Sequence, residues 1–275
     1  MNVLIVEGGA MRSVFSAGLL DGFMQQQFNP FERYIGVSAG ASNLVPFLSG
    51  NIKQSFQMYL KLSQHPTFIS LLRFFKGGHL LDLDLLHSEI TALGFNVDNF
   101  LTPDKTFEIV TTDVNTGPPV FIKPTKHNLV EVLIASMALP MIYRQFPIID
   151  GISMADGGMA NAIPVQAAIA QGAKKIIVVR ARSKDYKKKD TLGHRYIRWH
   201  LKDYPVLVQA MKARTSKHAD TVALIASPPQ GVHIIDVFPP DDFQLGRFGR
   251  NQQHIHYGYR SGFNMAKDVI QQWHR

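Results

Sequence analysis

RYIGVSAGASNL, residues 33–44, places a serine between two glycines directly after a short apolar run. Small residues on both sides of a serine permit a sharp turn from a strand into a helix, which exposes the hydroxyl at the carboxyl end of the strand. The segment therefore predicts a strand, a tight turn and a helix, with Ser38 as a candidate nucleophile. A structural glycine turn in which Ser38 only caps the helix is the alternative.

The residues that precede this segment repeat its pattern. A short β-branched run over residues 3–6 ends in a glycine turn, and residues 13–27 follow with apolar side chains at the three-to-four spacing of a helix. Two successive strand–turn–helix units predict a parallel sheet with crossover helices. Both turns then leave the sheet at the same edge, where the active sites of parallel sheets form.

The first glycine turn, Gly8-Gly9-Ala10, is a candidate oxyanion hole. Backbone N–H groups of a glycine-rich turn at a helix start can stabilise the negative charge that develops during ester cleavage. Arg12, which follows in the sequence, could hold this loop or help to bind an anionic headgroup. The turn matches neither the G-x-G-x-x-G pattern nor the ending of a P-loop, so nucleotide binding is not favoured.

Composition and length indicate a globular chain without disulfides. The 275 residues are 45% hydrophobic and 18% charged and include no cysteine, which also excludes thiolate metal sites. We expect one domain over residues 1–275, with a motif-bearing core over about 1–180 and a basic C-terminal extension over about 181–275. The N-terminus reads as a strand and no apolar run could span a bilayer, so a cytoplasmic protein is expected, with at most peripheral membrane contact.

The positive charge is concentrated in the C-terminal part of the chain. Residues 1–173 hold 10 Lys and Arg against 13 Asp and Glu, whereas residues 174–275 hold 19 against 8. Between residues 180 and 204 the basic side chains alternate with tyrosine and tryptophan, a mixture suited to an anionic membrane or to nucleic acid. An ordinary solvated surface is the alternative. We favour peripheral contact with an anionic membrane and expect no nucleic-acid partner.

A base for Ser38 has to come from elsewhere in the chain. Ser38 lies too early for the Ser–acid–His order of α/β-hydrolases. Asp150 is explained by a hairpin turn at Asp150-Gly151, and Asp113 by another turn. Asp156 instead ends a predicted strand directly before Gly157-Gly158, where a buried, oriented carboxylate could accept the serine proton.

The loop at residues 8–12, the elbow at residues 36–40 and the Asp156-Gly157-Gly158 motif together resemble the patatin-like phospholipases, in particular their bacterial members. This family combines a glycine-rich oxyanion loop followed by a basic residue, a G-x-S-x-G elbow and a D-G-G/A motif in the same order. The resemblance covers about residues 1–180.

The resemblance implies a three-layer α/β/α fold with a mostly parallel central sheet. It also implies a lipid acyl hydrolase that uses a Ser38–Asp156 dyad, with no catalytic histidine, metal or cofactor. The implied substrates are phospholipids, lysophospholipids or other fatty-acyl esters. Ala10 and Ser13 stand where the family usually has glycine, which keeps open a lipid-binding or regulatory protein on the same fold with weak or no catalysis.

Three weaker expectations concern other segments. Residues 254–273 are expected to form a closing helix. His254 and His256 would lie on one face if they belonged to a strand, where a zinc site is conceivable, although an ordinary surface or helix-end pair is favoured. Residues 51–100 are expected to form amphipathic helices that carry little chemistry. Four apolar residues are candidates to line an acyl pocket, or else to be plain core: Met137, Leu139, Met141 and Phe146.

Overall fold

The computed structural model describes residues 1–93, 95, 104–140, 142–186 and 201–275. A mostly parallel sheet runs through the molecule in the order β5-β6-β3-β2-β1-β7-β8, and β4 pairs with β3. Strands β3, β2, β1, β7 and β8 are parallel, whereas β4, β6 and β5 add antiparallel pairs at one side. The strands are β1 (Asn2–Val6), β2 (Arg33–Val37), β3 (Thr106–Asp113), β4 (Pro119–Ile122), β5 (Ile148–Ile149), β6 (Ile152–Asp156), β7 (Lys175–Val179) and β8 (His233–Val237).

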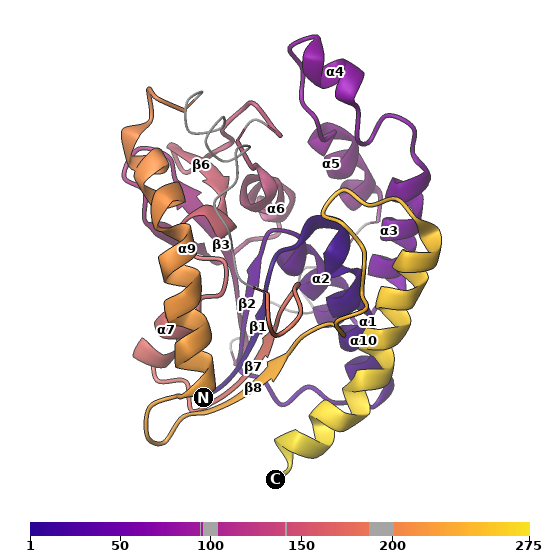
Figure 1. Cartoon of the computed structure of the whole chain (residues 1–275), viewed down its shortest axis with the longest axis vertical. Coiled ribbons are helices and arrows are strands. Elements are labelled where there is room, and N and C mark those ends of the chain that lie inside the picture. Colours follow the sequence, from indigo (N-terminus) through magenta and orange to yellow (C-terminus); the bar gives the residue numbers. More distant parts are fainter. Residues whose placement is uncertain (94, 96–103, 141, 187–200) are drawn as a thin grey trace.

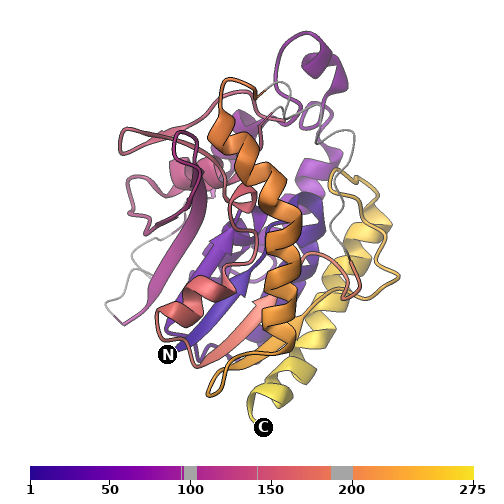
Figure 2. The ribbon, with the colours of Figure 1, turned by 60° about the vertical axis from the view of Figure 1, so that its left-hand side comes forward.

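Helices cover both faces of this sheet (Figures 1 and 2). The short helices η1 (Ala10–Ser13) and η3 (Gly157–Met159) follow β1 and β6. On one side of the sheet lie α1 (Val14–Gln25), α2 (Ala39–Leu48), α3 (Gln54–Gln64), α4 (Leu71–Phe75), α5 (Leu83–Ala92), α6 (Leu129–Met137) and α10 (Gln252–Trp273). On the other side lie α7 (Val165–Ala170) and α9 (Pro205–Ala226). The predicted α/β/α class with a mostly parallel sheet is confirmed.

The central strand β1 shows why two helical layers are needed. Val3 and Ile5 point into an apolar cluster with α7, while Leu4 and Val6 point into the larger cluster formed with α1 and α2. Side chains of a strand alternate between its two faces, so a fully apolar strand must be covered on both. The continuous apolar run at the start of the chain therefore predicts a central, buried strand.

The C-terminal part of the chain is built into these layers. Strand β8 lies parallel beside β7, and α10 packs along α1. A Cβ atom on Gly18 would lie 2.0 Å from the Tyr259 carbonyl oxygen, and one on Gly262 would lie 2.0 Å from that of Phe15. The two helices therefore approach through their backbones, which only glycine at these positions permits.

Most of the local predictions agree with the structure. The hairpin between β5 and β6 turns at Asp150 (φ 48°) and Gly151 (φ 80°), as the Asp-Gly pair predicts. Helix α6 ends before Pro140, and Asp113 accepts two N–H bonds within a turn. No described helix is long and apolar enough to cross a membrane.

The helix predicted over residues 254–273 is present, so His254 and His256 do not have the strand arrangement that the zinc alternative needed. Both residues lie in α10, where side chains two positions apart point about 200° apart around the helix axis. Within the described ranges, no cluster of three or more His, Cys, Asp or Glu side chains could hold a metal ion. The segment is helical because its apolar residues recur at helical spacing, so that one side of α10 is buried against α1.

Candidate active site

Ser38 lies at the sharp turn between β2 and α2. Its backbone has φ 53° and ψ −129°, an unusual conformation for a residue with a side chain. A Cβ on Gly36 would lie 2.4 Å from Ala41 Cα, and one on Gly40 would lie 2.4 Å from the Val6 carbonyl oxygen. The two glycines are therefore required by close backbone approach, and the predicted strand–turn–helix geometry is present.

A helix from elsewhere in the chain holds this strained turn. The Ser38 N–H donates a 2.8 Å hydrogen bond to the Ser136 hydroxyl oxygen in α6. The Ser136 hydroxyl in turn donates to the Val110 carbonyl oxygen of β3, at 2.6 Å. Ser136 is fully buried, so its hydrogen bonds are shielded from competing water. Nothing in the local sequence distinguishes Ser136 from other helical serines.

Asp156 ends β6 and is buried beside Ser38. Its Oδ1 accepts the Gly158 N–H at 2.7 Å, which fixes the carboxyl group. Burial raises the pKa of Asp156, while the positive charges of Arg214 and Arg247, the Gly158 N–H and a hydrogen bond from the Ser38 side chain partly lower it. The Asp156 carboxyl group and Ser38 line the same cavity.

The Gly8-Gly9-Ala10 turn lies directly against the serine. A Cβ on Gly8 would lie only 2.7 Å from Ser38 Cβ, so the loop backbone reaches the serine only because Gly8 has no side chain. Among the described residues, none accepts a hydrogen bond from the N–H groups of Gly8, Gly9 or Ala10. Unpaired N–H groups near a nucleophile can serve as oxyanion donors.

Two contacts that the sequence did not predict hold this loop. The buried Asn43 side chain in α2 donates to the Ser13 carbonyl oxygen at 2.7 Å and to the Ser16 hydroxyl at 3.0 Å. On the other side, the Met11 N–H donates to the Arg247 carbonyl oxygen at 3.1 Å. The loop is thus fixed between α2 and the segment that precedes α10.

Ala10 has a left-handed backbone, with φ 51°. We expect Ala10→Gly to raise the free energy of unfolding by about 1 kcal/mol, because glycine adopts positive φ without the steric cost of a Cβ atom. Urea denaturation measures the change. Ala223→Gly in the exposed part of α9 is the matched control and should lower the stability by about 1 kcal/mol. A loss of stability in both variants would contradict the strain at Ala10.

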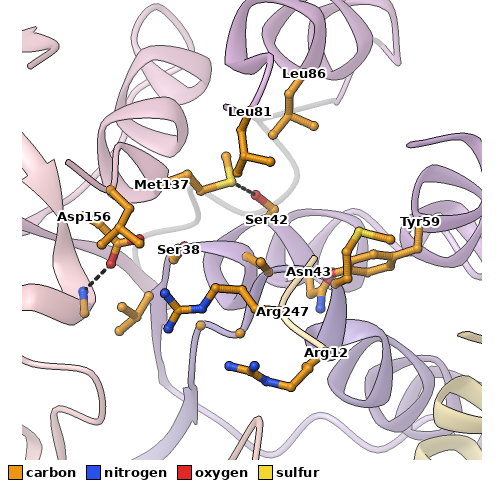
Figure 3. A pocket seen from close by; sticks show the side chains of 18 of the residues that line it. Arg12, Ser38, Ser42, Asn43, Tyr59, Leu81, Leu86, Met137, Asp156 and Arg247 are labelled. Carbon is orange, nitrogen blue, oxygen red and sulfur yellow. Dashed lines mark hydrogen bonds between the residues drawn. The ribbon is translucent and has the colours of Figure 1, made fainter. Parts of the chain in front are cut away.

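One cavity of about 160 Å³ brings the candidate residues together. Ser38, Asp156 and Arg12 line it (Figure 3). The Gly8-Gly9-Ala10 turn also lines it. Arg12 is buried, and its Nε has no hydrogen-bond partner within the described ranges. Burial, and then the charges of Arg182 and Arg247, lower the pKa of Arg12 to about 9. The site therefore combines a hydroxyl, a carboxylate, unpaired N–H groups and positive charge.

The cavity also has an apolar part, formed by helices in which the sequence showed little chemistry. Side chains from α3, α5 and α6 supply it: Met58, Leu62, Leu83, Leu86, Ile90, Leu133 and Met137. Of the residues predicted for an acyl pocket, Met137 and Leu139 line the cavity, whereas Phe146 lies outside it and packs against Tyr204. Met141 lies outside the described residues.

The fold and the site define a class of protein. An α/β sheet that presents a serine at a strand–helix elbow, next to a buried carboxylate and unpaired N–H groups, has the parts needed for acyl transfer through a serine ester. The apolar part of the cavity suits a long hydrocarbon chain.

Sequence comparisons identify the family. Residues 4–169 match the family model described as patatin-like phospholipase, and residues 204–275 match a domain of unknown function, DUF6363. The chain therefore belongs to the patatin-like phospholipase family, as its three motifs indicated, and lipid hydrolysis is the general activity of this family.

A relative and a solved structure extend the comparison. The chain is 32% identical over 265 residues to YjjU of Escherichia coli (strain K12), described as an uncharacterized protein, with 94% of this chain and 74% of that relative covered. The crystal structure of VipD from Legionella pneumophila has a TM-score of 0.47 and 11% identity, over 98% of this chain and 67% of that chain.

Proposed function

We propose that the protein is a serine lipid acyl hydrolase with a Ser38–Asp156 dyad. In this mechanism Asp156 accepts the Ser38 proton as the serine oxygen attacks the acyl carbonyl. The N–H groups of Gly8, Gly9 and Ala10 stabilise the oxyanion. When the intermediate collapses, the ester C–O bond breaks and the leaving alcohol takes the proton from Asp156. Water then attacks the acyl-enzyme, which releases the fatty acid and returns the proton to Ser38. The observation that carries the proposal is that the Ser38 hydroxyl, the Asp156 carboxyl and these unpaired N–H groups line one cavity.

The substrate proposed is a phospholipid, a lysophospholipid or another fatty-acyl ester. The apolar part of the cavity between α3, α5 and α6 supports a substrate with a fatty acyl chain. Moving such a chain from water into contact with apolar side chains lowers the free energy. The steps use only side chains and backbone groups of this chain, so the mechanism requires neither a metal nor a cofactor.

A lipid-binding protein with weak or no catalysis is the second candidate. Ala10 favours it, because the left-handed backbone at this residue is strained where glycine would not be. The two candidates differ in one property, which is whether the serine is activated.

Labelling with a fluorophosphonate probe distinguishes these candidates. We expect the wild-type protein to react and the adduct to be found by peptide mass spectrometry on Ser38. Ser42→Ala, which changes another serine of the same cavity, should still be labelled. Absence of any labelling of the wild type, together with binding to liposomes, would support the lipid-binding alternative.

We further propose that this is a cytoplasmic protein that meets membranes peripherally. The basic C-terminal third is one candidate contact surface, although its residues 187–200 lie outside the described residues. A second candidate is the tip at α4, which projects from the molecule (Figure 1). Leu71, Leu72 and Phe75 are 64%, 67% and 80% exposed there. Phe68 and Ile69, directly before α4, line the cavity, so the tip adjoins the lipid site.

Placing an acidic residue on this tip should separate two activities. We expect Phe75→Asp to lower hydrolysis of phospholipid vesicles about tenfold, because charge at an exposed apolar position opposes insertion into the membrane interface. Hydrolysis of a short-chain ester dissolved in water should change little. Ile52→Asp, at an exposed apolar residue before α3, is the control. Equal loss with both substrates would argue against a membrane role for α4.

A further inference from the structure

Four arginines line the cavity that holds Ser38. Arg12 belongs to η1, Arg182 follows β7, Arg214 lies in α9, and Arg247 lies between β8 and α10. In Figure 3, the guanidinium group of Arg247 extends toward Ser38, and that of Arg12 lies on the same side. The apolar side chains Leu81 and Leu86 lie on the opposite side of the view. The cavity therefore has a basic part and an apolar part, with the serine between them.

Arg12 is buried, and Arg182, Arg214 and Arg247 are half-buried. Within the described part of the chain, no carboxylate forms an ion pair with any of the four. The Nε atoms of Arg12 and Arg214 are buried and make no hydrogen bond to any residue that the structure describes. Arg12 is only 6% exposed. Burying a guanidinium group without a partner is costly, so such a group points to an anion that binds there.

The two carboxylates that line the cavity from the described part of the chain do not balance this charge. Glu7 accepts the Ala181 N–H at 2.8 Å, and Asp156 accepts the Gly158 N–H at 2.7 Å. Among the described residues, four guanidinium groups against two carboxylates leave two positive charges in the cavity. The lowered pKa of Arg12, caused by burial and then by Arg182 and Arg247, agrees with a site where positive charges crowd together.

We propose that the four arginines bind the phosphate of the substrate headgroup, so that the enzyme prefers phospholipids with a phosphate monoester headgroup. This inference rests on the proposed acyl hydrolase function and deepens it. The planar guanidinium group matches phosphate oxygens with paired hydrogen bonds. A phosphate monoester carries up to two negative charges near neutral pH, which equals the excess positive charge of the cavity. The cation of a choline or ethanolamine headgroup would meet charge of its own sign.

The proposal also assigns a role to the C-terminal region. Arg214 and Arg247 both lie in residues 204–275, the segment that matches a domain of unknown function. The catalytic candidates lie in the residues matched by the patatin-like model. In this interpretation, the N-terminal part supplies the ester-cleaving groups, and the C-terminal part completes the headgroup site.

Kinetics with matched lipids test the preference. We expect the wild type to hydrolyse dioctanoyl phosphatidic acid with a kcat/KM about tenfold higher than dioctanoyl phosphatidylcholine, since hydrogen bonds to charged groups contribute about this factor. Arg247→Gln should reduce this ratio of kcat/KM values by about tenfold, mainly through KM for the anionic lipid. Arg247→Lys should restore part of it. Arg260→Gln, at an exposed arginine of α10 outside the cavity, should leave the ratio as in the wild type.

The ratio separates headgroup binding from an effect on the base. Arg247 also lowers the pKa of Asp156, so its loss would change the rate with every substrate. Such a change cancels in the ratio, because the same base acts on both lipids. Equal kcat/KM values for both lipids in the wild type would overturn the proposal.

Binding to an inactive variant gives a second, independent test. Ser38→Ala protein should bind dioctanoyl phosphatidic acid more tightly than the choline lipid in calorimetry, and Arg247→Gln in that background should remove the difference. Inorganic phosphate is the third ligand. If inorganic phosphate binds with a millimolar Kd while neither lipid is preferred, the cavity binds a free anion and the substrate assignment is wrong. Loss of this preference alone leaves the acyl hydrolase proposal intact, whereas full activity of Ser38→Ala would overturn that function itself.

Discussion

Ser38→Ala is expected to lower kcat for fatty-acyl ester hydrolysis by about 10³-fold or more, since no acyl-enzyme can form without the serine oxygen. The variant should remain folded. The backbone of residue 38 keeps its N–H bond to Ser136 and its carbonyl bond to the Ala41 N–H, and neither involves the hydroxyl group. Release of fatty acid from a lipid substrate measures the effect, and circular dichroism checks the fold.

The matched control is another serine in the same cavity. Ser42 lies about one helical turn further along α2, and its hydroxyl lies 3.7 Å from the Met137 sulfur. Ser42→Ala should retain most of the activity, because a hydroxyl–thioether contact is weak. If Ser38→Ala retained full activity, or if Ser42→Ala lost as much as Ser38→Ala, the serine assignment would be wrong.

Asp156→Asn is expected to lower kcat by about 10²- to 10⁴-fold, which is the usual contribution of a general base. The amide is nearly the same size, and its oxygen can still accept the Gly158 N–H, so the local structure should be preserved. The amide cannot accept the serine proton. His218→Gln is the control, because His218 lines the same cavity from α9. A comparable loss in His218→Gln, with Asp156→Asn active, would identify the histidine as the base.

The pH profile provides a further readout for Asp156. Burial raises its pKa above the ordinary value, and the base must be ionised to act, so kcat/KM should increase with pH through this pKa. Arg247 favours the ionised form. Arg247→Gln should therefore raise the pKa of Asp156 and move the acidic limb of the profile to higher pH. A limb that moves to lower pH would contradict the assigned electrostatics.

Local patterns predicted several elements correctly, each for a local reason. The elbow at Ser38 depends on Gly36 and Gly40, because a Cβ atom on either would clash with residue 41 or with the neighbouring strand β1. The Asp150-Gly151 turn depends on positive φ at both of its residues. The continuous apolar run of β1 predicts burial on both faces because side chains alternate along a strand. The left-handed backbone of Ala10 was not predictable, since alanine rarely adopts it.

The residues that complete the site were accessible only from the packed structure. Asn43, Ser136 and the arginines after residue 180 have no distinctive spacing. The partners of Asn43 and Ser136 lie 30 and 98 positions away, and the arginines lie far from Ser38 in the sequence. The apolar part of the cavity was not predicted either. The amphipathic pattern of α3 and α5 indicates only that one side of each helix is buried, and not that this side lines a cavity.

By itself, the sequence determined the strand–turn–helix elbow, the alternating burial of the central strand and the candidate nucleophile and acid, because these depend on backbone sterics and short-range periodicity. The tertiary structure alone decided that Asp156 and Ser38 line one cavity. It also decided that α3 and α5 line the apolar part of this cavity, and that four arginines far apart in the sequence line its basic part. These contacts arise where separate elements pack around one sheet, and pairing between distant segments leaves no periodic signal in a single sequence.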